Sequence, residues 1–339
     1  MDKRLLIAVA ASIAAILALP ALGAPPDYAA LRNALQTEHV QPGYVHFADK
    51  ARGLDHAITA HCLNTGDNPQ QLAAKTAFHE ALDVWQAVQH IRHGAVTTQD
   101  RHARLQFWPD QRGTGERHMR KLLAAPLADT LMDDITTTSV ALQGFPALER
   151  LLFADQPLSQ RPLEGETAAR CPVARAIAHN IAGIAGALAS AEPQSTDDKT
   201  FVADAVNDLV VGLEFIRSLK LKLPAGVRKP RPHLLENWRS HRSLRNVEIN
   251  IRALRALYGI LASGLADNAG TAKVLSDFDT ALDAVRAMGK NGEVVLGEDD
   301  GPKRFKALAA LIEHLRDDMV KTMPENLGIT LGFNSLDGD

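Results

Sequence analysis

The chain has 339 residues, with 37 lysines and arginines against 40 aspartates and glutamates and a net charge of −3. Proteins that bind nucleic acid usually carry a basic surplus, so this balance argues against nucleic acid as a partner. Hydrophobic residues make up 46% of the chain, and its length suffices for one large or two ordinary domains with buried cores.

Residues 1–23 have the pattern of a cleaved signal peptide. The basic residues Lys3 and Arg4 precede an apolar run over 5–19, and small residues follow it. We place the cleavage before Ala24. A transmembrane anchor would need about 18 to 20 apolar residues, and this run is shorter. The sequence therefore predicts export.

The chain contains only two cysteines, Cys62 and Cys171. Exported proteins fold in an oxidising compartment, so the sequence predicts one disulfide between them. Two buried free thiols are the alternative.

Apolar residues recur every three or four positions through most of the chain, which predicts amphipathic helices. In the clearest case the helix begins near Pro69 and stops at Gly94, with Phe78, Leu82 and Trp85 on one face. In chain order, the pattern predicts helices over 44–63, 69–93, 117–125, 127–135, 139–153, 173–191, 197–220, 243–265, 272–288 and 303–321. Long helices joined by short turns pack as antiparallel neighbours. We therefore expect an all-α fold of two packed helical-bundle domains with long antiparallel helices.

Two breaks organise this helical pattern. The segment 192–195 contains Pro193 and divides the chain into an N-terminal bundle over 24–192 and a C-terminal bundle over 193–339. A second break, over 222–233, combines three prolines with the basic residues Arg228, Lys229 and Arg231. It predicts a non-helical, solvated loop.

The segment 144–153 places a charge in an apolar context. Pro146 lies inside a helical pattern and predicts a kink, and Gly144 before it permits close packing. Glu149 lies on the strongly apolar part, where a charge needs a partner. That partner is either an arginine or a ligand in a cleft that the carboxylate lines.

A stripe of arginines follows Trp238. Arg239, Arg242 and Arg245 recur every three residues, so they either form a solvated face or offer guanidinium groups to an anionic ligand. The apolar tail after residue 326 should dock on the body of the protein and bring Asp337 near its surface.

Two histidine patterns are candidates for metal chemistry. His79 and Glu80 resemble the start of a zinc-protease helix, with Asp83 where the second histidine would stand. His90 and His93 are three positions apart and could share a helix face as metal ligands.

Several of these segments, taken together, resemble the imelysin-like (peptidase M75-type) family of exported bacterial proteins. The segments that carry the resemblance are 85–94, the loop Phe107-Trp108-Pro109-Asp110, 144–153, 238–246 and the terminal Gly332-Phe333-Asn334 with Asp337-Gly338-Asp339. The resemblance implies two helical-bundle domains, location in the periplasm or at the outer membrane, and an association with iron uptake.

The family is characterised by a Gly-x-His-x-x-Glu motif that is proposed to bind metal in a cleft between the domains. Gly144 and Glu149 match this motif, but Pro146 stands where the histidine would be. The resemblance therefore implies a metal, iron or another divalent ion, held by Glu149 with a histidine from another helix such as His90, or a different ligand in the same place.

These observations favour a non-enzymatic exported binding protein that serves iron uptake through a cleft between two helical domains. Its partner would be a metal ion or a small anionic ligand, with an envelope or outer-membrane protein as a further partner. The candidate cleft residues are Glu149, Gly144, Trp85, Trp238, Arg239, Arg242 and Asp337. The alternatives are a metallopeptidase built on the helix of His79 and a helical interaction module that docks on an envelope partner through the basic loop 228–231.

Overall fold

The structure is a computed structural model that describes residues 26–64, 68–125, 135–155, 158, 161–162, 164–167, 169–193, 195–265 and 268–330. Within these ranges it contains helices and no strand, which confirms the predicted all-α fold. The expected signal peptide, most of the helix expected over 127–135, and Asp337 lie outside the described residues. None of the helices in the described ranges combines the length and apolarity needed to cross a bilayer.

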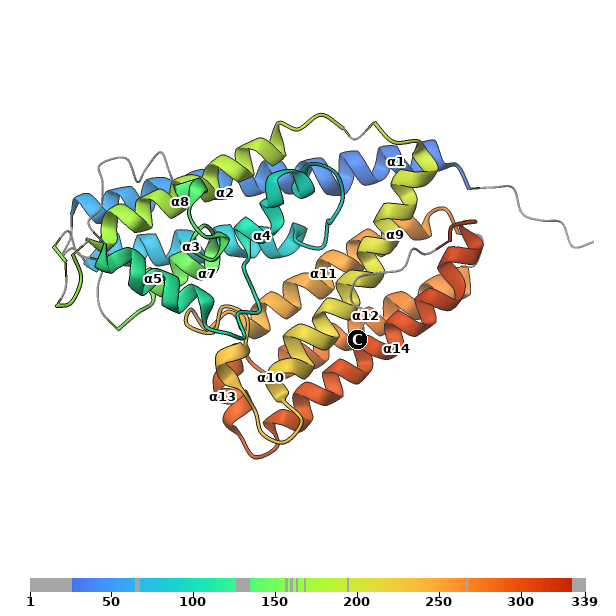
Figure 1. Cartoon of the computed structure of the whole chain (residues 1–339). Helices are drawn as coiled ribbons and strands as arrows, with labels where there is room; N and C mark the ends of the chain where they lie inside the picture. The colour runs from blue at the N-terminus through green and yellow to red at the C-terminus, as the bar shows by residue number, and fades with distance from the viewer. Residues whose placement is uncertain are drawn as a thin grey trace, which may run out of the picture.

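The first half of the chain is built on three long helices that run side by side (Figure 1). They are α2 (Gln41–Leu63), α3 (Asn68–Val88) and α8 (Arg170–Ala189). Shorter elements pack around them: η2 (Gly94–Asp100), α4 (Arg101–Leu105), α5 (Thr114–Ala124), η3 (Ile135–Thr137), η4 (Val140–Leu142) and α7 (Phe145–Leu152). The core contains interlocking aromatic rings, with Phe47 5.5 Å from Trp85 and Phe78 5.8 Å from Phe145 between ring centroids.

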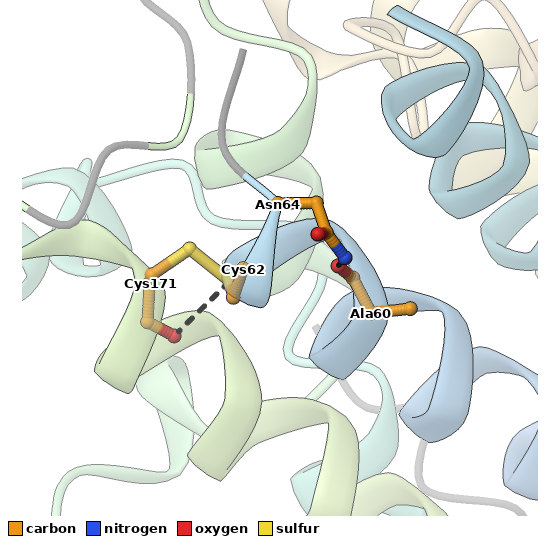
Figure 2. Close-up of a disulfide and its surroundings, with 4 residues drawn as sticks. All are labelled: Ala60, Cys62, Asn64 and Cys171. Carbon is orange, nitrogen blue, oxygen red and sulfur yellow. Dashed lines mark hydrogen bonds between the residues drawn. A yellow bond between two sulfur atoms is a disulfide. The ribbon is translucent and has the colours of Figure 1, made fainter. Parts of the chain in front are cut away.

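A disulfide joins Cys62, at the end of α2, to Cys171, in the first turn of α8. Figure 2 shows the bond between the two helix ends, where the Cys62 sulfur also lies 3.8 Å from the Cys171 carbonyl oxygen. The predicted disulfide is confirmed. A loop of 109 positions closed in this way stabilises the fold by about 5 kcal/mol in the chain-entropy model.

The second half is a bundle of four long helices (Figure 1). These are α9 (Asp198–Phe215), which continues through the π-helical η5 (Ile216–Lys222), and α11 (Ser243–Ala262), α12 (Asn268–Ala287) and α14 (Gly301–Asn326). Between them lie α10 (Leu223–Ala225), η6 (Pro232–Leu234) and α13 (Gly292–Gly297). The prediction of a non-helical loop over 222–233 is partly wrong, because α10 and the start of η6 lie within it. Between them, Arg228 and Lys229 are exposed.

The N-terminal helix packs with the second half rather than the first. Helix α1 (Tyr28–Ala34) and the π-helical η1 (Leu35–Val40) lead directly into α2, but α1 lies against α9 (Figure 1). Leu31 and Leu35 therefore belong to the core formed by residues beyond 200. The expected division of the chain at residue 192 does not predict that α1 packs against α9. Periodicity shows that a helix has an apolar face, but it does not show which helix covers that face.

The two halves meet through polar side chains. Gln86, in the last turn of α3, accepts a hydrogen bond from Asn250 of α11 through its backbone oxygen at 2.7 Å. Just beyond α3, the backbone N–H of Arg92 donates to the Asp208 carboxylate of α9 at 3.0 Å. Both acceptors are buried, so the junction combines two apolar cores with a polar layer between them.

Candidate functional site

A cavity of about 230 Å³ lies where three segments converge. The segments are the first turns of α7, the loop between α4 and α5, and the loop between η6 and α11. The aromatic rings of Phe107, Trp108 and Trp238 form apolar walls. Charged side chains line the rest of the cavity: Asp110, Glu116, Glu149, Arg150 and Arg239.

The start of α7 places Glu149 at this cavity. Gly144 precedes the helix in an extended conformation, and a Cβ atom there would collide with the carbonyl oxygens of Arg104 and Leu105. Pro146 lies in the first turn of α7, where its missing N–H costs no helical hydrogen bond. The predicted kink at Pro146 is therefore wrong: the proline begins a helix instead of bending one.

Glu149 is buried, with 2% of its surface exposed. Its carboxyl group accepts hydrogen bonds from the backbone N–H of Ser240 at 3.0 Å and from the Ser240 hydroxyl at 2.5 Å. Burial raises the pKa of Glu149 to about 7, although the donors of Ser240 and the charge of Arg239 oppose the rise. The side chain thus exchanges a proton near neutral pH.

The loop that supplies Ser240 is sharply curved. Asn237 and His241 have positive φ angles of 49° and 58°, which few residues other than glycine adopt. The N–H of Arg242 donates to the Asn237 carbonyl at 3.1 Å, and the Ser240 hydroxyl lies 3.1 Å from the same oxygen. A hydroxyl has one hydrogen, so Ser240 donates to Glu149 when the carboxyl group is ionised and is free to donate to Asn237 when it is protonated.

Two guanidinium groups flank Glu149 in the cavity. Arg150 pairs with Asp110 at 3.3 Å and with Glu116 at 3.0 Å. Arg239 lies over the Trp238 ring at 4.3 Å and approaches Glu116 at 3.7 Å. Burial, followed by the neighbouring charge of Arg150, lowers the pKa of Arg239 from its usual value.

Asp110 and Glu116 differ in how firmly they are held. The Asp110 carboxylate also accepts from the N–H groups of Thr114 and Gly115, at 2.7 and 2.8 Å, and thereby caps α5. Glu116 is on the surface, with 55% of its side chain exposed. Asp110 is therefore held in place by the start of α5, whereas Glu116 can move away from the guanidinium groups at little cost in free energy.

A buried network of polar side chains holds the loop that contains Ser240. Lys220 and Glu236 form an ion pair at 2.7 Å, with only 1% of each side chain exposed. The Gln106 amide donates to Glu236 at 3.0 Å and to Asn237 at 3.2 Å, and the Asn246 amide donates to the same two residues at 2.8 and 3.0 Å. The network fixes Asn237 and hence the position of Ser240.

No local pattern predicts Lys220 and Gln106 as members of this network, because each lies in an ordinary helical or loop context. The density of polar residues over 236–246 indicates a polar site before α11. It does not single out Ser240, since a lone serine forms no pattern.

The structure separates the predicted arginine stripe. Trp238 and Arg239 line the Glu149 cavity. Arg242 instead pairs with Asp83 on a different face, where Arg245 also reaches Asp83 at 3.4 Å. The positive-φ turn before α11 breaks the three-residue spacing, because Arg239 precedes the helix.

Two other predicted site residues, Trp85 and Gly144, support the packing of the fold and do not line the Glu149 cavity. Trp85 is fully buried and contacts Phe47 and His102 rather than the cavity. Gly144 acts through the close approach of its backbone and lines no cavity wall.

His90 does not line the cavity of Glu149. It lies against α9, where a Cβ atom on Gly212 would contact it at 3.4 Å, and its Nε2 atom is 2.8 Å from Nε2 of His39. Burial, followed by the charges of His39, Arg92 and His93, lowers the pKa of His90 well below its usual range. The expected pairing of Glu149 with His90 is not what the described residues show.

The helix of His79 does not assemble a zinc-protease site. Glu80 is exposed and pairs with Lys50 at 2.9 Å, and Asp83 is engaged by two arginines. His79 stacks on Phe153 at 5.2 Å, and burial followed by the charge of Arg242 lowers its pKa to about 4. The groups that would bind and activate a zinc ion therefore face different partners.

The donors around Glu149 do not fit a bare metal ion. Pro146 supplies no nitrogen ligand, and one Glu149 oxygen already accepts both hydrogen bonds from Ser240. The charge of Arg239 acts on the Glu149 carboxyl group and would repel a cation there. Among the described residues, the group of side chains with metal-ligand spacing is Asp277, His314 and Asp318, which lies on the surface, where Lys273 pairs with both carboxylates.

The fold and this cavity define an all-helical protein with two bundled halves and a polar cavity near their junction. Residues 40–319 match the family model of Imelysin (peptidase M75). A match over most of the chain shows that the protein belongs to the Imelysin family.

Two solved structures share the fold. An imelysin-like protein from Psychrobacter arcticum 273-4 is 16% identical, with a TM-score of 0.72 over 91% of this chain and 99% of its own. A protein from Parabacteroides distasonis ATCC 8503, described as an iron-regulated protein A precursor, is 14% identical, with a TM-score of 0.67 over 89% and 97% of the two chains. A comparison with curated proteins gives no match.

Proposed function

We propose that this protein is an exported binding protein of the Imelysin family that holds a small polycarboxylate in the Glu149 cavity and serves iron acquisition. The observation that carries the proposal is that two guanidinium groups, Arg150 and Arg239, line the same cavity as the buried carboxyl group of Glu149, whose pKa burial raises to about 7. Guanidinium groups match the planar geometry of carboxylates.

Glu116 already occupies the position that a ligand carboxylate would take. One of its oxygens lies 3.0 Å from Arg150 and 3.7 Å from Arg239. Because exposed ion pairs contribute only about 0–1 kcal/mol, a ligand with two or more carboxylates can displace this side chain. A ligand held between the aromatic walls would exclude water from its own contacts with the guanidinium groups and so strengthen them.

Glu149 supplies the complementary donor. In its protonated form it can give a hydrogen bond to a ligand oxygen, in the way that a buried neutral carboxylic acid acts elsewhere. The cavity of about 230 Å³ suits a ligand of few atoms. A citrate-sized molecule meets these requirements.

The association with iron is supported by the fold shared with the iron-regulated protein A precursor from Parabacteroides distasonis. Hard cations prefer oxygen ligands, and ferric iron is such a cation. A polycarboxylate would therefore deliver iron as a complex, so that the cavity need not ligate the metal itself.

Isothermal titration of the chain from residue 24 with citrate, and with ferric citrate, tests this proposal. We expect saturable binding, and we expect Arg239→Gln to weaken it at least tenfold. Arg242→Gln is the matched control, because that guanidinium group pairs with Asp83 outside the cavity, and its affinity should stay within twofold of the wild type.

Failure of both probes to bind the wild type, or equal binding by Arg239→Gln, would refute the polycarboxylate site. If citrate binds and ferric citrate is rejected, the site stands but its role in iron acquisition does not.

A further inference from the structure

A second cavity, of about 390 Å³, lies apart from Glu149 and shares no lining residue with its cavity. Its walls come from η1 and the start of α2, the segment after α3, the end of α8, and the first turn of α9. It therefore lies between the two cores, with Tyr44 and Leu188 from one core and Phe201 from the other. Its volume falls in the range of small-molecule sites.

One wall of this cavity carries a buried carboxylate–histidine pair. His93 Nδ1 lies 2.7 Å from the Asp208 carboxylate, which also accepts from the N–H of Arg92 at 3.0 Å. Asp208 is only 3% exposed. The arrangement fixes the His93 ring, and among the described residues Nε2 has no hydrogen-bond partner. That nitrogen is left for a ligand.

The charge of His93 is favoured by its setting. Burial lowers the pKa of His93, but the hydrogen bond to Asp208 and its charge outweigh burial, so that the pKa is raised above its usual value. Arg101 also lines the cavity, with one guanidinium nitrogen donating to the Ala95 carbonyl at 2.9 Å. Two cationic groups therefore line the same space, together with one carboxylate, that of the exposed Glu192.

Tyr44 also lines the cavity, and only 4% of its surface is exposed. Its hydroxyl is shielded from solvent and has no hydrogen-bond partner among the described residues. Tyr44 therefore contributes ring surface to the wall, and the polar contacts of the cavity fall to His93 and Arg101.

The rest of the wall is apolar and aromatic. Phe201 meets the His93 ring edge-to-face at 5.2 Å, and Arg32 lies 5.2 Å from the ring centre of the same phenylalanine. Ile91 and Leu188 add aliphatic surface. A ligand in this cavity would meet cations at one end and hydrocarbon along its body.

The wall formed by η1 is itself unusual. Residues Leu35–Val40 form a π-helical turn, and both Gln36 and Val40 line the cavity. Short π-helical turns inside α-helices are rare and occur often at functional sites. This backbone feature is independent of the charges on the opposite wall.

We propose that this cavity is a second binding site, which takes a small monocarboxylate with an aromatic or branched apolar body. The carboxylate accepts hydrogen bonds from His93 Nε2 and Arg101, and the body packs on Phe201, Ile91 and Leu188. The site does not depend on the polycarboxylate proposed for the Glu149 cavity.

Titration of the chain from residue 24 with phenylacetate, followed by isothermal calorimetry and by the methyl NMR signals of Ile91 and Leu188, tests the proposal. We expect saturable binding that shifts both methyl groups. Phenylacetamide, the neutral analogue, should bind at least tenfold more weakly. His93→Gln and Arg101→Gln should each weaken phenylacetate at least fivefold.

Arg239→Gln is the matched control from the other cavity and should bind phenylacetate as the wild type does, while His93→Gln should keep its affinity for citrate. Arg101→Gln keeps the test valid if loss of His93 unfolds the protein, because Arg101 is partly exposed. Absence of saturable methyl shifts, equal affinity for phenylacetamide, or unchanged binding in Arg101→Gln would each overturn the proposal.

Discussion

Glu149 and Asp208 are buried to a similar extent, at 2% and 3% exposure, but they have different partners. Asp208 accepts from the imidazole of His93 and from a backbone N–H. Glu149 accepts from Ser240, and among the described residues no cation hydrogen-bonds to it.

The difference shows that the partner, not burial alone, decides what a buried carboxyl group does. Burial raises the pKa of both groups. The donors of His93 and Arg92 oppose the rise at Asp208, whereas Ser240 and the charge of Arg239 oppose it at Glu149, whose pKa reaches about 7. Asp208 thus holds His93 and the backbone of Arg92 in place, whereas Glu149 is able to change charge near neutral pH.

The largest expected effect concerns a third buried carboxylate, Glu236, which has the strongest partner. Lys220→Met removes that partner and leaves Glu236 buried without a cation. Removal of one member of a buried pair costs about 3–5 kcal/mol, so we expect a loss of about 4 kcal/mol in urea unfolding at pH 7. The double variant Lys220→Met/Glu236→Gln should recover at least half of it. A single variant that loses less than about 1 kcal/mol would show that the pair does not anchor the junction.

Asp208→Asn removes the negative charge that pairs with His93. We expect a loss of about 3 kcal/mol at pH 6, because the charged partner of His93 disappears. A raised histidine pKa adds stability that is complete below about pH 6.5 and is lost as pH rises through the folded value. The loss in urea unfolding should therefore be smaller at pH 9. Equal losses at both pH values would argue against an ion pair.

Glu149→Gln should increase the free energy of unfolding instead of decreasing it. Because the folded-state pKa is raised, the folded protein holds the proton more tightly, and stability falls as pH rises from about 4.5 through about 7. A neutral amide avoids this cost, so the variant should be more stable than the wild type by about 3 kcal/mol at pH 8. Urea unfolding of both proteins at about pH 4, below the unfolded-state pKa, where the difference should nearly vanish, provides the control. A less stable variant at pH 8 would mean that ionised Glu149 is well partnered.

The smallest expected effect is that of Glu116→Gln. This side chain competes with a ligand for Arg150 and Arg239, so its neutralisation should tighten citrate binding about threefold in calorimetry. Its exposure limits the change in unfolding free energy to about 0.5 kcal/mol. Weaker citrate binding would show that Glu116 supports the ligand instead of competing with it.

Local patterns in the sequence sufficed for the long helices, but they did not predict the short helices α1, α4 and α13. The periodicity between Pro69 and Gly94 predicts α3, and the same reasoning locates α2, α8, α11, α12 and α14 to within a few residues. The failure at Pro146 has a local cause as well: a proline fits either a kink or a first turn, and only the extended Gly144 before it decides between them.

Part of the site also followed from the sequence. Glu149 stood out because a charge within an apolar helix needs a partner, and Trp238 and Arg239 stood out because polar residues cluster before a helix. Their convergence in one cavity is a property of the fold, as is the separation of Arg242, which depends on the positive-φ turn at Asn237 and His241.

The sequence by itself determined the helical architecture, the family and the disulfide, because these depend on periodicity, on an ordered set of motifs and on a count of two cysteines. Tertiary structure alone decided which groups meet the buried charges. Ser240 lies 91 positions from Glu149, and Asp208 lies 115 positions from His93. Pairings at such distances leave no local pattern, since the free energy that selects them arises only when the two halves of the chain pack and exclude water.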